Sequence, residues 1–414
     1  MSSEKPTLLV TTSTFPRWVG DSEPRFVYDL SKRLTTDFKV IILAPHAANT
    51  ASHEIWEGMQ VYRYRYAPKN LQTLTYNGGI TANLKQNPWK FLLLPLFFIG
   101  QWWALKKVLN QYSIDTIHAH WLIPQGLVAA VTLLGYQKRV KLVCTSHGGD
   151  LFGLQGKIST FLKRWVIKRC DSITVVSQAM LAKVQELTHN QYSSIHIIPM
   201  GTDLTNTFVP NSSIIRATNQ LLFVGRLVEK KGLSYLLQAV YKLKPIFPDL
   251  ELIIAGSGPL QTQLMGQTKQ LGITEHVQFV GRLTHLELVR LYQAATLAVF
   301  PFIQAKDGDM EGLGLVMIEA MGCGCPVIAS DLPAVKDVIH PNENGKLVKS
   351  EDSAALVEAI MILLDNSAQR QRLSNQARLT VHKAFDWESI TQCYQQCLQL
   401  KPCTLPVSEI AYVE

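Results

Sequence analysis

Two glutamates eight positions apart, Glu311 and Glu319, are the residues of this chain best suited to chemistry. Two glycines follow Glu311 within three residues and open an apolar helical pattern. A helix N-terminus carries unpaired N–H donors and about half a positive charge, so this segment can bind an anion such as a diphosphate. On one continuous helix the two glutamates would lie about 12 Å apart along the axis and roughly 80° apart around it. One could then reach a sugar while the other reached the far end of a nucleotide.

Simpler interpretations of these acids stay open at this point. A glutamate before a helix can serve only the helix dipole, and Glu319 could be an ordinary surface residue. Nearby, Asp307 and Asp309 have the spacing of a metal-binding pair. Cys323-Gly-Cys325 also has the look of a metal pair, but its short spacing and the lack of a nearby histidine favour small core residues.

The composition predicts a globular protein that binds anions. The 414 residues are enough for two or three domains, and they are 47% hydrophobic and 17% charged. Forty basic residues against 32 acidic ones give a net charge of +8, which favours phosphates, nucleic acid or an acidic membrane. Seven cysteines without a CxxC motif indicate a reducing compartment. The N-terminus runs directly into a predicted strand and does not resemble a signal peptide.

The most hydrophobic stretch runs from Phe91 to Leu105 and is shorter than the roughly 20 residues needed to span a bilayer. It predicts either a buried helix or a helix at a membrane interface. The interfacial alternative is suggested by flanking aromatic and basic side chains, namely Trp89, Trp102, Trp103, Lys85, Lys90, Lys106 and Lys107. A second amphipathic helix is expected over residues 158–169, with Phe161, Leu162 and Trp165 on one face and Lys157, Arg164 and Lys168 on another. It could pack on its domain or meet an acidic membrane.

Short apolar runs alternate with helical patterns along the chain. Runs of this kind without polar alternation predict strands buried on both faces, as in a parallel sheet. The first half contains Thr7–Thr12, Val40–Ala44, Ile114–His118, Lys141–Thr145 and Ser172–Ser177. The second half contains Leu221–Gly225, Leu250–Ala255, Val277–Gly281, Leu297–Pro301 and Pro326–Ala329. Thr284 and Glu287 form a capping-box pattern that starts one helix. Each half is therefore predicted to be a doubly wound α/β sheet, with a boundary in the polar segment Gly201–Asn219.

Several loops after these strands carry glycines, basic residues or histidines. In the second half they are Val224–Gly232 (VGRLVEKKG), Ala255–Leu260 (AGSGPL), Val280–Leu283 (VGRL) and the segment around Glu311. In the first half they are Phe15–Glu23 (FPRWVGDSE), Ile117–Trp121 (IHAHW) and Thr145–Asp150 (TSHGGD). Taken together, these motifs resemble those of the retaining family-4 glycosyltransferases over about residues 7 to 400.

The resemblance implies the GT-B architecture, an α/β fold of two facing Rossmann-like doubly wound domains with a C-terminal helix crossing back. It places an acceptor-binding domain at residues 1–205 and a nucleotide-sugar donor-binding domain at 206–385. A C-terminal helix, 386–401, would pack back on the N-terminal domain, and residues 402–414 would form a loose tail.

The family also implies roles for individual residues. Four are expected to be catalytic: His120, Glu311, Arg226 and Lys231. Lys230 is the less certain basic neighbour. Eleven are expected to bind the donor: Gly20, Gly225, Gly256, Gly258, Gly281, Arg282, Gly312, Leu313, Gly314, Leu315 and Glu319. Three are expected on the acceptor or sugar side: His147, Gly148 and Asp150. The family generally needs no metal, so none is expected at Asp307 and Asp309, and no cofactor is expected beyond the donor substrate.

One motif departs from the family pattern. Members usually have a glycine directly before the first helix, where this chain has Glu23-Pro24-Arg25. Gly20 could serve instead. Pro24 suits the first turn of the helix expected over Arg25–Leu34.

The resemblance implies transfer of a hexosyl group from a nucleoside diphosphate sugar to a hydroxyl, with retention of configuration. Either the leaving phosphate deprotonates the acceptor through an oxocarbenium-like state, or a carboxylate forms a covalent intermediate. The first is favoured because no carboxylate in the N-terminal motifs is an obvious nucleophile. Domain closure would then exclude water. A hexose on UDP or GDP is the default donor, while the sugar, base and acceptor stay open.

Three other functions compete with this one. A nucleotide-sugar epimerase could use the same architecture, but its basic motif would differ from GRLVEKKG. A glycoside hydrolase needs two carboxylates roughly 5 to 9.5 Å apart, which the two glutamates would not satisfy on a continuous helix. A binding protein would fit the positive charge, although no nucleic-acid module is present in the sequence.

The expected partners are the donor, a saccharide or lipid-linked acceptor and an acidic membrane surface, without nucleic acid. The expected place is the cytoplasm, with the inner face of the cytoplasmic membrane as an alternative, in polysaccharide, lipopolysaccharide or glycolipid synthesis.

Overall fold

The computed structural model describes residues 5–21, 23–76, 78–192 and 194–399, which divide into two compact units. The described residues of unit 1 lie within Met1–Val176, Met180–Ile198 and Thr391–Leu405. Those of unit 2 lie within Ser177–Ala179 and Pro199–Ile390. The tail expected at 402–414 lies outside the described residues.

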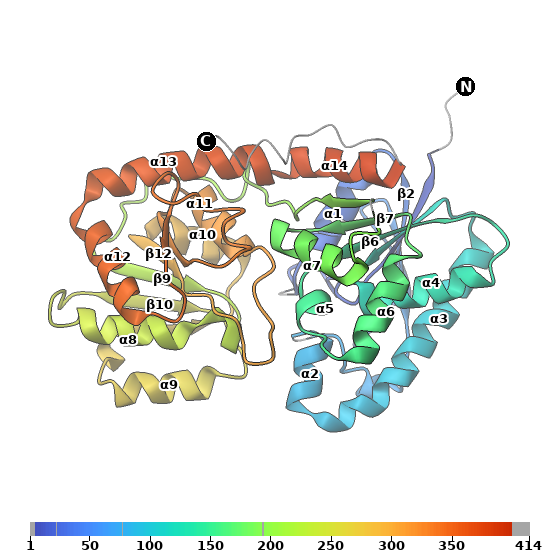
Figure 1. Cartoon of the computed structure of the whole chain (residues 1–414), viewed down its shortest axis with the longest axis horizontal. Coiled ribbons are helices and arrows are strands. Elements are labelled where there is room, and N and C mark those ends of the chain that lie inside the picture. Colours follow the sequence, from blue (N-terminus) through green and yellow to red (C-terminus); the bar gives the residue numbers. More distant parts are fainter. Residues whose placement is uncertain (1–4, 22, 77, 193, 400–414) are drawn as a thin grey trace. The chain divides into compact units, whose positions relative to one another are not determined.

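Unit 1 is built on an eight-stranded sheet in the order β3-β4-β2-β1-β5-β6-β7-β8 (Figure 1). All neighbours are parallel except the edge pair β3 and β4. The strands are β1 Thr7–Thr11, β2 Lys39–Pro45, β3 His53–Trp56, β4 Met59–Tyr64, β5 Thr116–His120, β6 Lys141–Ser146, β7 Ser172–Val175 and β8 Ile195–Ile197. Every residue of β5 and β7 is buried, as expected for strands covered by helices on both faces.

Helices cover both faces of the unit 1 sheet. They are α1 Phe26–Leu34, α2 Ile80–Gln86, α3 Leu93–Gln111, α4 Leu127–Leu134, α5 Gly149–Phe152, α6 Lys157–Ile167 and α7 Gln178–Thr188, with short turns η1 Lys69–Leu71, η2 Pro88–Leu92 and η3 Leu122–Gly126. Figure 1 shows α3, α4 and α6 on one face of the sheet and α1 on the other. The last helix, α14 Trp387–Gln399, joins unit 1 through its second half, where Lys141 donates to the Cys397 carbonyl at 2.6 Å and Tyr394 to the Ile198 carbonyl at 3.0 Å.

Unit 2 has a six-stranded parallel sheet in the order β11-β10-β9-β12-β13-β14. Its strands are β9 Gln220–Val224, β10 Glu251–Ala255, β11 Val277–Gly281, β12 Leu297–Phe300, β13 Val327–Ser330 and β14 Lys346–Val348. The order reverses between β9 and β12, so the carboxyl ends of those strands flank a topological switch point, where open α/β sheets bind ligands.

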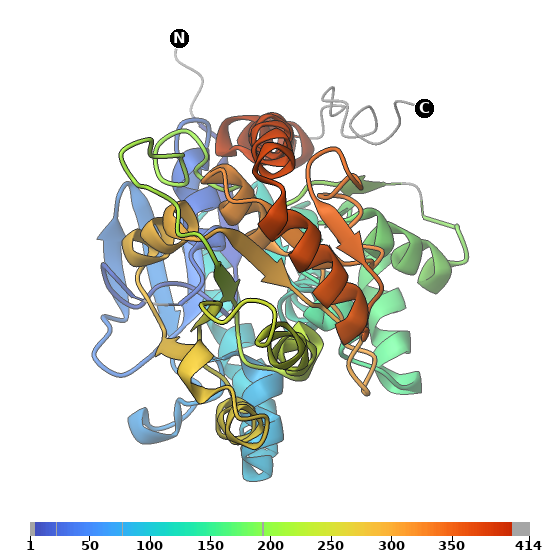
Figure 2. The same ribbon diagram turned by 90° about the vertical axis from the view of Figure 1, so that its left-hand side faces the viewer.

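Two helix layers enclose this sheet (Figures 1 and 2). The helices are α8 Leu233–Leu243, α9 Gln261–Gln270, α10 His285–Ala294, α11 Leu315–Gly322, α12 Ser353–Asp365 and α13 Ser367–Phe385, with turns η4 Glu229–Lys231 and η5 Thr274–His276. Helix α8 contacts α9 and α12 on one face, and α11 contacts α10 and α13 on the other. The predicted capping box is confirmed, because the Thr284 side chain accepts from the Glu287 N–H and Glu287 accepts from the Thr284 N–H.

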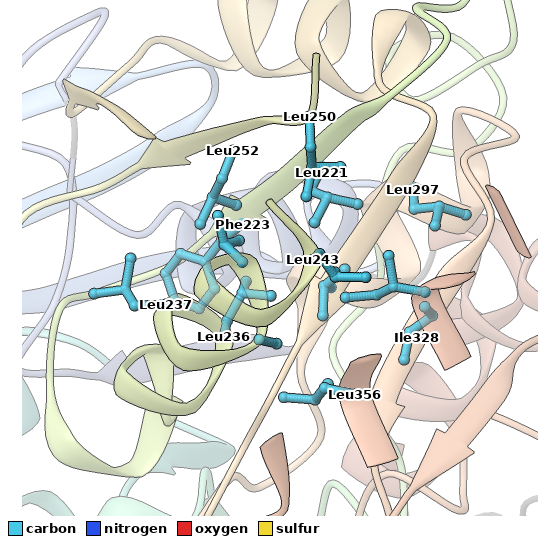
Figure 3. Packing of buried hydrophobic residues seen from close by; sticks show 14 of the residues in the cluster. Leu221, Phe223, Leu236, Leu237, Leu243, Leu250, Leu252, Leu297, Ile328 and Leu356 are labelled. Carbon is cyan, nitrogen blue, oxygen red and sulfur yellow. The ribbon is translucent and has the colours of Figure 1, made fainter. Parts of the chain in front are cut away.

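The core of unit 2 lies between the sheet and α8 (Figure 3). Phe223 from β9 and Leu252 from β10 pack with Leu236 and Leu237 from α8, all completely buried. Each such side chain stabilises the fold by about 1.5–3 kcal/mol relative to an exposed position. This core fixes the ends of β9, β10 and β12, and therefore the loops that follow them.

All ten predicted strands are confirmed, with ends shifted by two residues or fewer at every boundary. The largest shift that matters is β5, which runs over Thr116–His120 rather than Ile114–His118, so His120 is the last residue of the strand. Four strands had no prediction: β3, β4, β8 and β14. Two of them have only three residues, and β3 and β4 have exposed or alternating positions that do not form continuous apolar runs. Cys323 and Cys325 are completely buried core residues, as predicted.

Candidate active site

An ion pair between Lys231 and Glu311 is the centre of the candidate site in unit 2. The Lys231 Nζ lies 2.6 Å from Glu311 Oε2, and both side chains are largely shielded, with 12% and 14% of their surface exposed. The same Nζ lies 4.6 Å from the centroid of the Phe302 ring, which supports it from the side. Eighty residues separate the two charges along the chain, so this pair exists only in the folded protein.

A glycine explains how Lys231 reaches that place. Gly232 has φ +62°, and a Cβ there would lie 1.8 Å from the carbonyl oxygen of Pro301. The close approach brings η4 against the end of β12, and the Ile303 N–H donates to the Lys230 carbonyl at 2.9 Å. Glycine is thus required at position 232 both for its backbone angle and for lack of space.

The local charges keep Glu311 ionised. Burial acts to raise the pKa of its carboxyl, but the positive charges of Lys231 and Lys230 outweigh it and lower the pKa to about 2. Lys230 is itself fixed, because its Nζ lies 3.2 Å from Asp309 Oδ1 and 3.2 Å from the Met310 carbonyl oxygen. Two cations and two carboxylates therefore organise the loop before α11.

The two glutamates do not share one helix. Helix α11 begins at Leu315, with Gly314 as its N-cap at φ +88°, so only Glu319 is helical and Glu311 lies in the preceding loop. The helical separation of about 12 Å therefore does not apply to this pair. Gly312, Leu313 and Gly314 form the turn between Glu311 and the helix, which places their backbone at the positive end of α11.

Glu319 has a different environment from Glu311. Its Oε2 accepts a hydrogen bond of 3.0 Å from the hydroxyl of Tyr292, a completely buried residue of α10. Burial raises the pKa of Glu319 to about 7, while the Tyr292 hydrogen bond and the charge of Lys231 act in the opposite direction. Lys231 thus influences both glutamates that the sequence singled out.

Three of the predicted donor-site glycines meet at the carboxyl ends of adjacent strands. The Gly225 N–H donates to the Ala255 carbonyl at 3.0 Å, and the Gly256 N–H donates to the Gly281 carbonyl at 2.7 Å. A Cβ on Gly256 would lie 1.9 Å from the Gly225 carbonyl oxygen, so no side chain fits there. Gly258 is similarly pressed against the backbone of Leu227, with a Cβ contact of 2.4 Å. These turns bring backbone groups to the sheet edge without side chains in the way.

Arginines follow two of these turns. Arg226 comes directly after Gly225, and its carbonyl accepts from the Val228 N–H at 2.9 Å. Arg282 follows Gly281, and its Nε donates to Ser257 Oγ at 2.6 Å across the loop that follows β10. Arg226, Lys230, Lys231 and Arg282 therefore concentrate positive charge at the carboxyl edge of this sheet, where an anion would be stabilised.

In unit 1 two of the predicted histidines, His120 and His147, lie next to each other. His120 Nδ1 and His147 Nε2 are 2.9 Å apart, and the two rings stack at 5.2 Å with an angle of 9°. Because both lie at strand ends, β5 and β6 place them side by side. Burial lowers the pKa of His147 to about 3 and that of His120 well below its usual value. Both imidazoles are therefore neutral near pH 7, and one donates to the other.

A third histidine lies beneath them. His118 is two residues earlier on the same strand. Its ring centroid lies 4.2 Å from that of His120 at an angle of 41°, and its Nε2 lies 2.7 Å from the Thr145 hydroxyl. Its pKa is lowered by burial to about 3. Within the described part of the chain, His120 Nε2 has no hydrogen-bond partner. His120 is also completely buried, so a ligand would reach it only if covering side chains moved.

Asp150 binds the protein's own chain. Its Oδ1 accepts from the Ser146 hydroxyl at 2.7 Å and its Oδ2 from the Leu122 N–H at 2.6 Å. Burial raises the pKa of this carboxyl, and the two hydrogen bonds oppose that effect. Asp150 thus joins the loop after β5 to the loop after β6, and Gly148, at φ +100°, is the N-cap of the short helix that carries it.

Gly20 lies in a loop that an ion pair closes. Arg17 donates from Nε and NH2 to the Asp21 carboxylate at 2.8 and 2.7 Å, and the Asp21 N–H donates to the Trp18 carbonyl. Gly20 has φ +83°, and a Cβ there would meet nothing within 4 Å, so its need for glycine is the backbone angle alone. The helix that follows begins at Phe26, one residue later than predicted.

Comparison with known proteins agrees with this arrangement. Residues 24–206 match the model named Glycosyltransferase Family 4, and residues 207–380 match the model named Glycosyl transferases group 1. The chain belongs to the family-4 glycosyltransferases. It is 27% identical to glycogen synthase of Mycobacterium tuberculosis over 94% of this chain and 93% of that protein.

Solved glycosyltransferase structures show the same fold. Sucrose-phosphate synthase from Thermosynechococcus elongatus superposes with a TM-score of 0.77 at 23% identity, covering 96% of this chain and all of that one. Anabaena HepE, solved in complex with UDP, has a TM-score of 0.71 at 18% identity, covering 95% and 100%. The predicted GT-B fold, with two Rossmann-like units, is confirmed.

Two residues of the candidate site had no role in the sequence-based prediction. Tyr292 contacts Glu319 from another helix 27 residues away, and no spacing rule connects them. His118 did carry a signal, because alternate residues of a strand face the same side and His118 and His120 are two apart.

Asp307 accepts the Asp309 N–H at 3.1 Å, and Asp309 pairs with Lys230. The expectation that no metal binds there stays a prediction.

Proposed function

We propose that this glycosyltransferase is a retaining, metal-independent hexosyltransferase. Its donor would be a nucleoside diphosphate sugar, bound by unit 2, and its acceptor a hydroxyl of a saccharide or lipid-linked saccharide, bound by unit 1. The observation that carries the proposal is the Lys231–Glu311 pair beside the basic turn after β9. The carboxylate can accept hydrogen bonds from sugar hydroxyls, and the cation beside it can donate hydrogen bonds to a diphosphate. Both functions then lie within one site.

Charge development explains why cations belong at this edge. As the glycosidic bond breaks, the leaving diphosphate gains negative charge, so Arg226 and Lys231 would stabilise the transition state more than the ground state. The N–H groups of Gly312 to Leu315 would bind the same phosphates at the positive end of α11. The ionised Glu311 would accept hydrogen bonds from sugar hydroxyls, and Glu319 from the ribose.

The proposed chemistry is a front-side exchange. The bond between the anomeric carbon and the phosphate oxygen breaks, and the acceptor oxygen bonds to that carbon from the same face. The acceptor proton passes to the leaving phosphate oxygen, so atoms and charge balance without a protein nucleophile. Neutral His120 would accept or donate a hydrogen bond on the acceptor side, and His147 would set which ring nitrogen of His120 carries the proton.

We infer UDP as the first donor nucleotide to test, with GDP second. HepE, whose fold this chain shares, was solved with UDP, and that supports the order of testing. For the acceptor we propose a component of a cell-surface polysaccharide or glycolipid, assembled at the cytoplasmic face of a membrane. The basic character of unit 1 supports an anionic or lipid-linked acceptor.

Thermal melting with nucleotides tests the donor site first. A ligand at 100 times its dissociation constant stabilises the folded protein by about 2.7 kcal/mol, which is easily detected. We expect a shift with one of UDP, GDP or ADP and with its sugar conjugate. The shift should vanish in Arg226→Ala and shrink in Glu319→Ala, but persist in the control Glu358→Ala, which changes an exposed acid of α12.

The stereochemistry tests the mechanism. Proton NMR of the product should show the same anomeric configuration as the donor. An inverted product would exclude the front-side exchange. If the donor sugar were epimerised without any acceptor, the protein would be a nucleotide-sugar epimerase on this fold. Absence of any nucleotide-dependent shift would contradict the proposed donor site.

A further inference from the structure

Helix α3 is apolar on two opposite faces. One face packs into unit 1 through Leu93, Phe97 and Leu105, which are at most 4% exposed. On the other face Leu96, Ile99 and Trp103 are 46%, 52% and 65% exposed. These three residues fall within an arc of about 60° along roughly 10 Å of the helix. A solvent-facing apolar stripe of this kind indicates a binding surface rather than a folding requirement.

Further exposed apolar residues lie just before α3 and at the start of α6. Leu92, immediately before the helix, is 77% exposed. Ile158 and Phe161, one turn apart at the start of α6, are 79% and 63% exposed. Helix α4 contacts both α3 and α6, so the three helices form one layer on the same face of the unit 1 sheet (Figure 1). We call these six residues, Leu92, Leu96, Ile99, Trp103, Ile158 and Phe161, the apolar surface of unit 1.

The part of the chain that carries these residues is strongly basic. Residues 58–170 contain fifteen lysines and arginines but only two acids, Asp115 and Asp150. Both acids bind the protein's own backbone, Asp115 at the Thr7 N–H and Asp150 at the Leu122 N–H. Lys106 and Lys107 are exposed one turn after Trp103, and Lys157 is exposed beside Ile158. The exposed charges on α3 itself and at the start of α6 are therefore positive.

Only some of the residues predicted to contact a membrane are exposed in the structure. Lys90 is buried and donates to Asn83 Oδ1 at 2.8 Å, so it cannot meet lipid headgroups. Trp102 is partly covered by Lys106, whose Nζ lies 4.1 Å from its ring centroid. Trp103 is thus the interfacial tryptophan of α3. In α6 the Arg164 Nε donates to the Leu187 carbonyl, which leaves Lys157 and Lys168 as the exposed basic groups among those predicted.

We propose that the apolar surface of unit 1 docks on a bilayer containing anionic phospholipids, with α3 lying along the interface. Apolar side chains would enter the acyl boundary while Lys106, Lys107 and Lys157 meet phosphate headgroups. The segment Pro88–Gln111 is longer than the apolar run expected from the sequence and is long and apolar enough to cross a membrane, but a third of its most apolar 18-residue window is buried inside the protein. Crossing would expose Phe97 and Leu105 and unpack Gly100 from the backbone of Arg65 and Tyr66, so an interfacial position is favoured.

Charge also argues against a second copy of the chain as the occupant. A symmetric contact through this surface would bring the lysines of both copies together, and like charges at a contact oppose association. An anionic bilayer instead neutralises them. The inference extends the proposed function by naming the surface that would hold the enzyme near a lipid-linked acceptor, and its test requires neither donor nor acceptor.

Co-sedimentation with vesicles tests the docking. We expect the full-length protein to bind vesicles of phosphatidylcholine with phosphatidylglycerol and to bind phosphatidylcholine alone much more weakly. Ile99→Glu should weaken binding more than about tenfold, because a charge would enter the acyl boundary. The matched control is Leu379→Glu on α13, at a residue 65% exposed, which should bind as the unaltered protein does.

A second pair of variants tests the charge. Lys106→Glu with Lys107→Glu should reduce binding to anionic vesicles more than about tenfold, since each basic group near the surface contributes about 1 kcal/mol. Lys269→Glu with Lys383→Glu, exposed lysines of α9 and α13, is the control. Lys231→Met should keep vesicle binding, which separates this inference from the donor site.

Three results would overturn the inference. The first is no binding to either vesicle type, and the second is binding that Ile99→Glu leaves unchanged. The third is a dimer in sedimentation velocity that Ile99→Glu converts to a monomer, which would show that a second copy covers the surface. Circular dichroism of each variant confirms that lost binding is not lost folding.

Discussion

The two groups of candidate residues differ in the kind of interaction that organises them. In unit 2 the central contact is ionic: Lys231 meets Glu311 at 2.6 Å, and Lys230 meets Asp309 at 3.2 Å. In unit 1 it is neutral: His120 and His147 share a hydrogen bond of 2.9 Å, and burial lowers the pKa of both. A half-site that must stabilise a departing diphosphate benefits from fixed charge, whereas one that handles a hydroxyl benefits from uncharged donors and acceptors.

The two groups also differ in the solvent exposure of their side chains. Lys231 and Glu311 keep 12% and 14% of their side-chain surface, so a ligand can reach them as the structure stands. His120 keeps none. The charged pair of unit 2 is therefore accessible without rearrangement, while the ring cluster of unit 1 is held by packing and would need a movement to contact a ligand.

The largest effect is expected from breaking the charged pair. Lys231→Met should lower kcat/KM more than about 1,000-fold, because it removes transition-state stabilisation and leaves Glu311 shielded without its cation. Steady-state kinetics with the identified donor measures this. Lys230→Met is the matched control and should lose much less, since its cation pairs with Asp309. Equal losses would show that the site does not depend on the Lys231–Glu311 contact.

Acidification should separate the two units. In unit 1 burial lowers the pKa of His118, His120 and His147, so below about pH 6.5 the unfolded chain binds more protons than the folded one, and stability falls as pH falls. Each group contributes about 1.4 kcal/mol per pH unit, and the raised pKa of Asp150 offsets part of this. We expect unit 1 to lose roughly 4 kcal/mol between pH 7 and pH 5.

Unit 2 should respond in the opposite direction. The pKa of Glu319 is raised by burial to about 7, so its contribution is complete below the unfolded value and is lost as pH rises through 7. Seven of the eight tryptophans lie in unit 1 and only Trp387 in unit 2. Urea midpoints from tryptophan emission should therefore fall below those from far-UV circular dichroism at pH 5 but not at pH 7. Coinciding midpoints at pH 5 would refute the contrast.

The two units should also differ in how closely their glycine loops are packed. Gly256→Ala should destabilise the protein by about 3 kcal/mol, because its Cβ would lie 1.9 Å from the Gly225 carbonyl. Gly20→Ala should cost about 1 kcal/mol, since only its positive φ is strained. Chemical denaturation of both variants measures the difference. Similar losses would mean that the turns after β9 and β10 are not closely packed.

A smaller effect on catalysis is expected at the histidines. His120→Asn should lower kcat about 100-fold with little change in donor KM, because general acid–base or hydrogen-bonding roles have about that size. His118→Asn is the control: it disturbs the contact with Thr145 and should change stability more than kcat. If both variants lost kcat equally, His120 would be a packing residue only.

Some of this site could be predicted because it follows from local pattern. The loops after β9, β10 and β11 come directly after continuous apolar runs, and such runs are typical of strands buried on both faces. Strands that are parallel neighbours place their carboxyl ends at one edge, which is why Gly225, Gly256 and Gly281 meet. The sequence left open whether one helix carries both glutamates, and the structure shows that it does not, because Gly314 adopts φ +88° and the helix begins at Leu315.

The amino-acid sequence was enough to predict the two α/β sheets, the family motifs and the candidate residues, because hydrophobic period and turn glycines are local properties of the chain. Only the folded structure shows which of these side chains contact one another. The contacts of Lys231 with Glu311 and of Tyr292 with Glu319 join positions 80 and 27 residues apart, and they depend on how helices pack on the sheet. Packing also determines that Phe97 is buried while Ile99, two residues later on the same apolar helix, faces solvent.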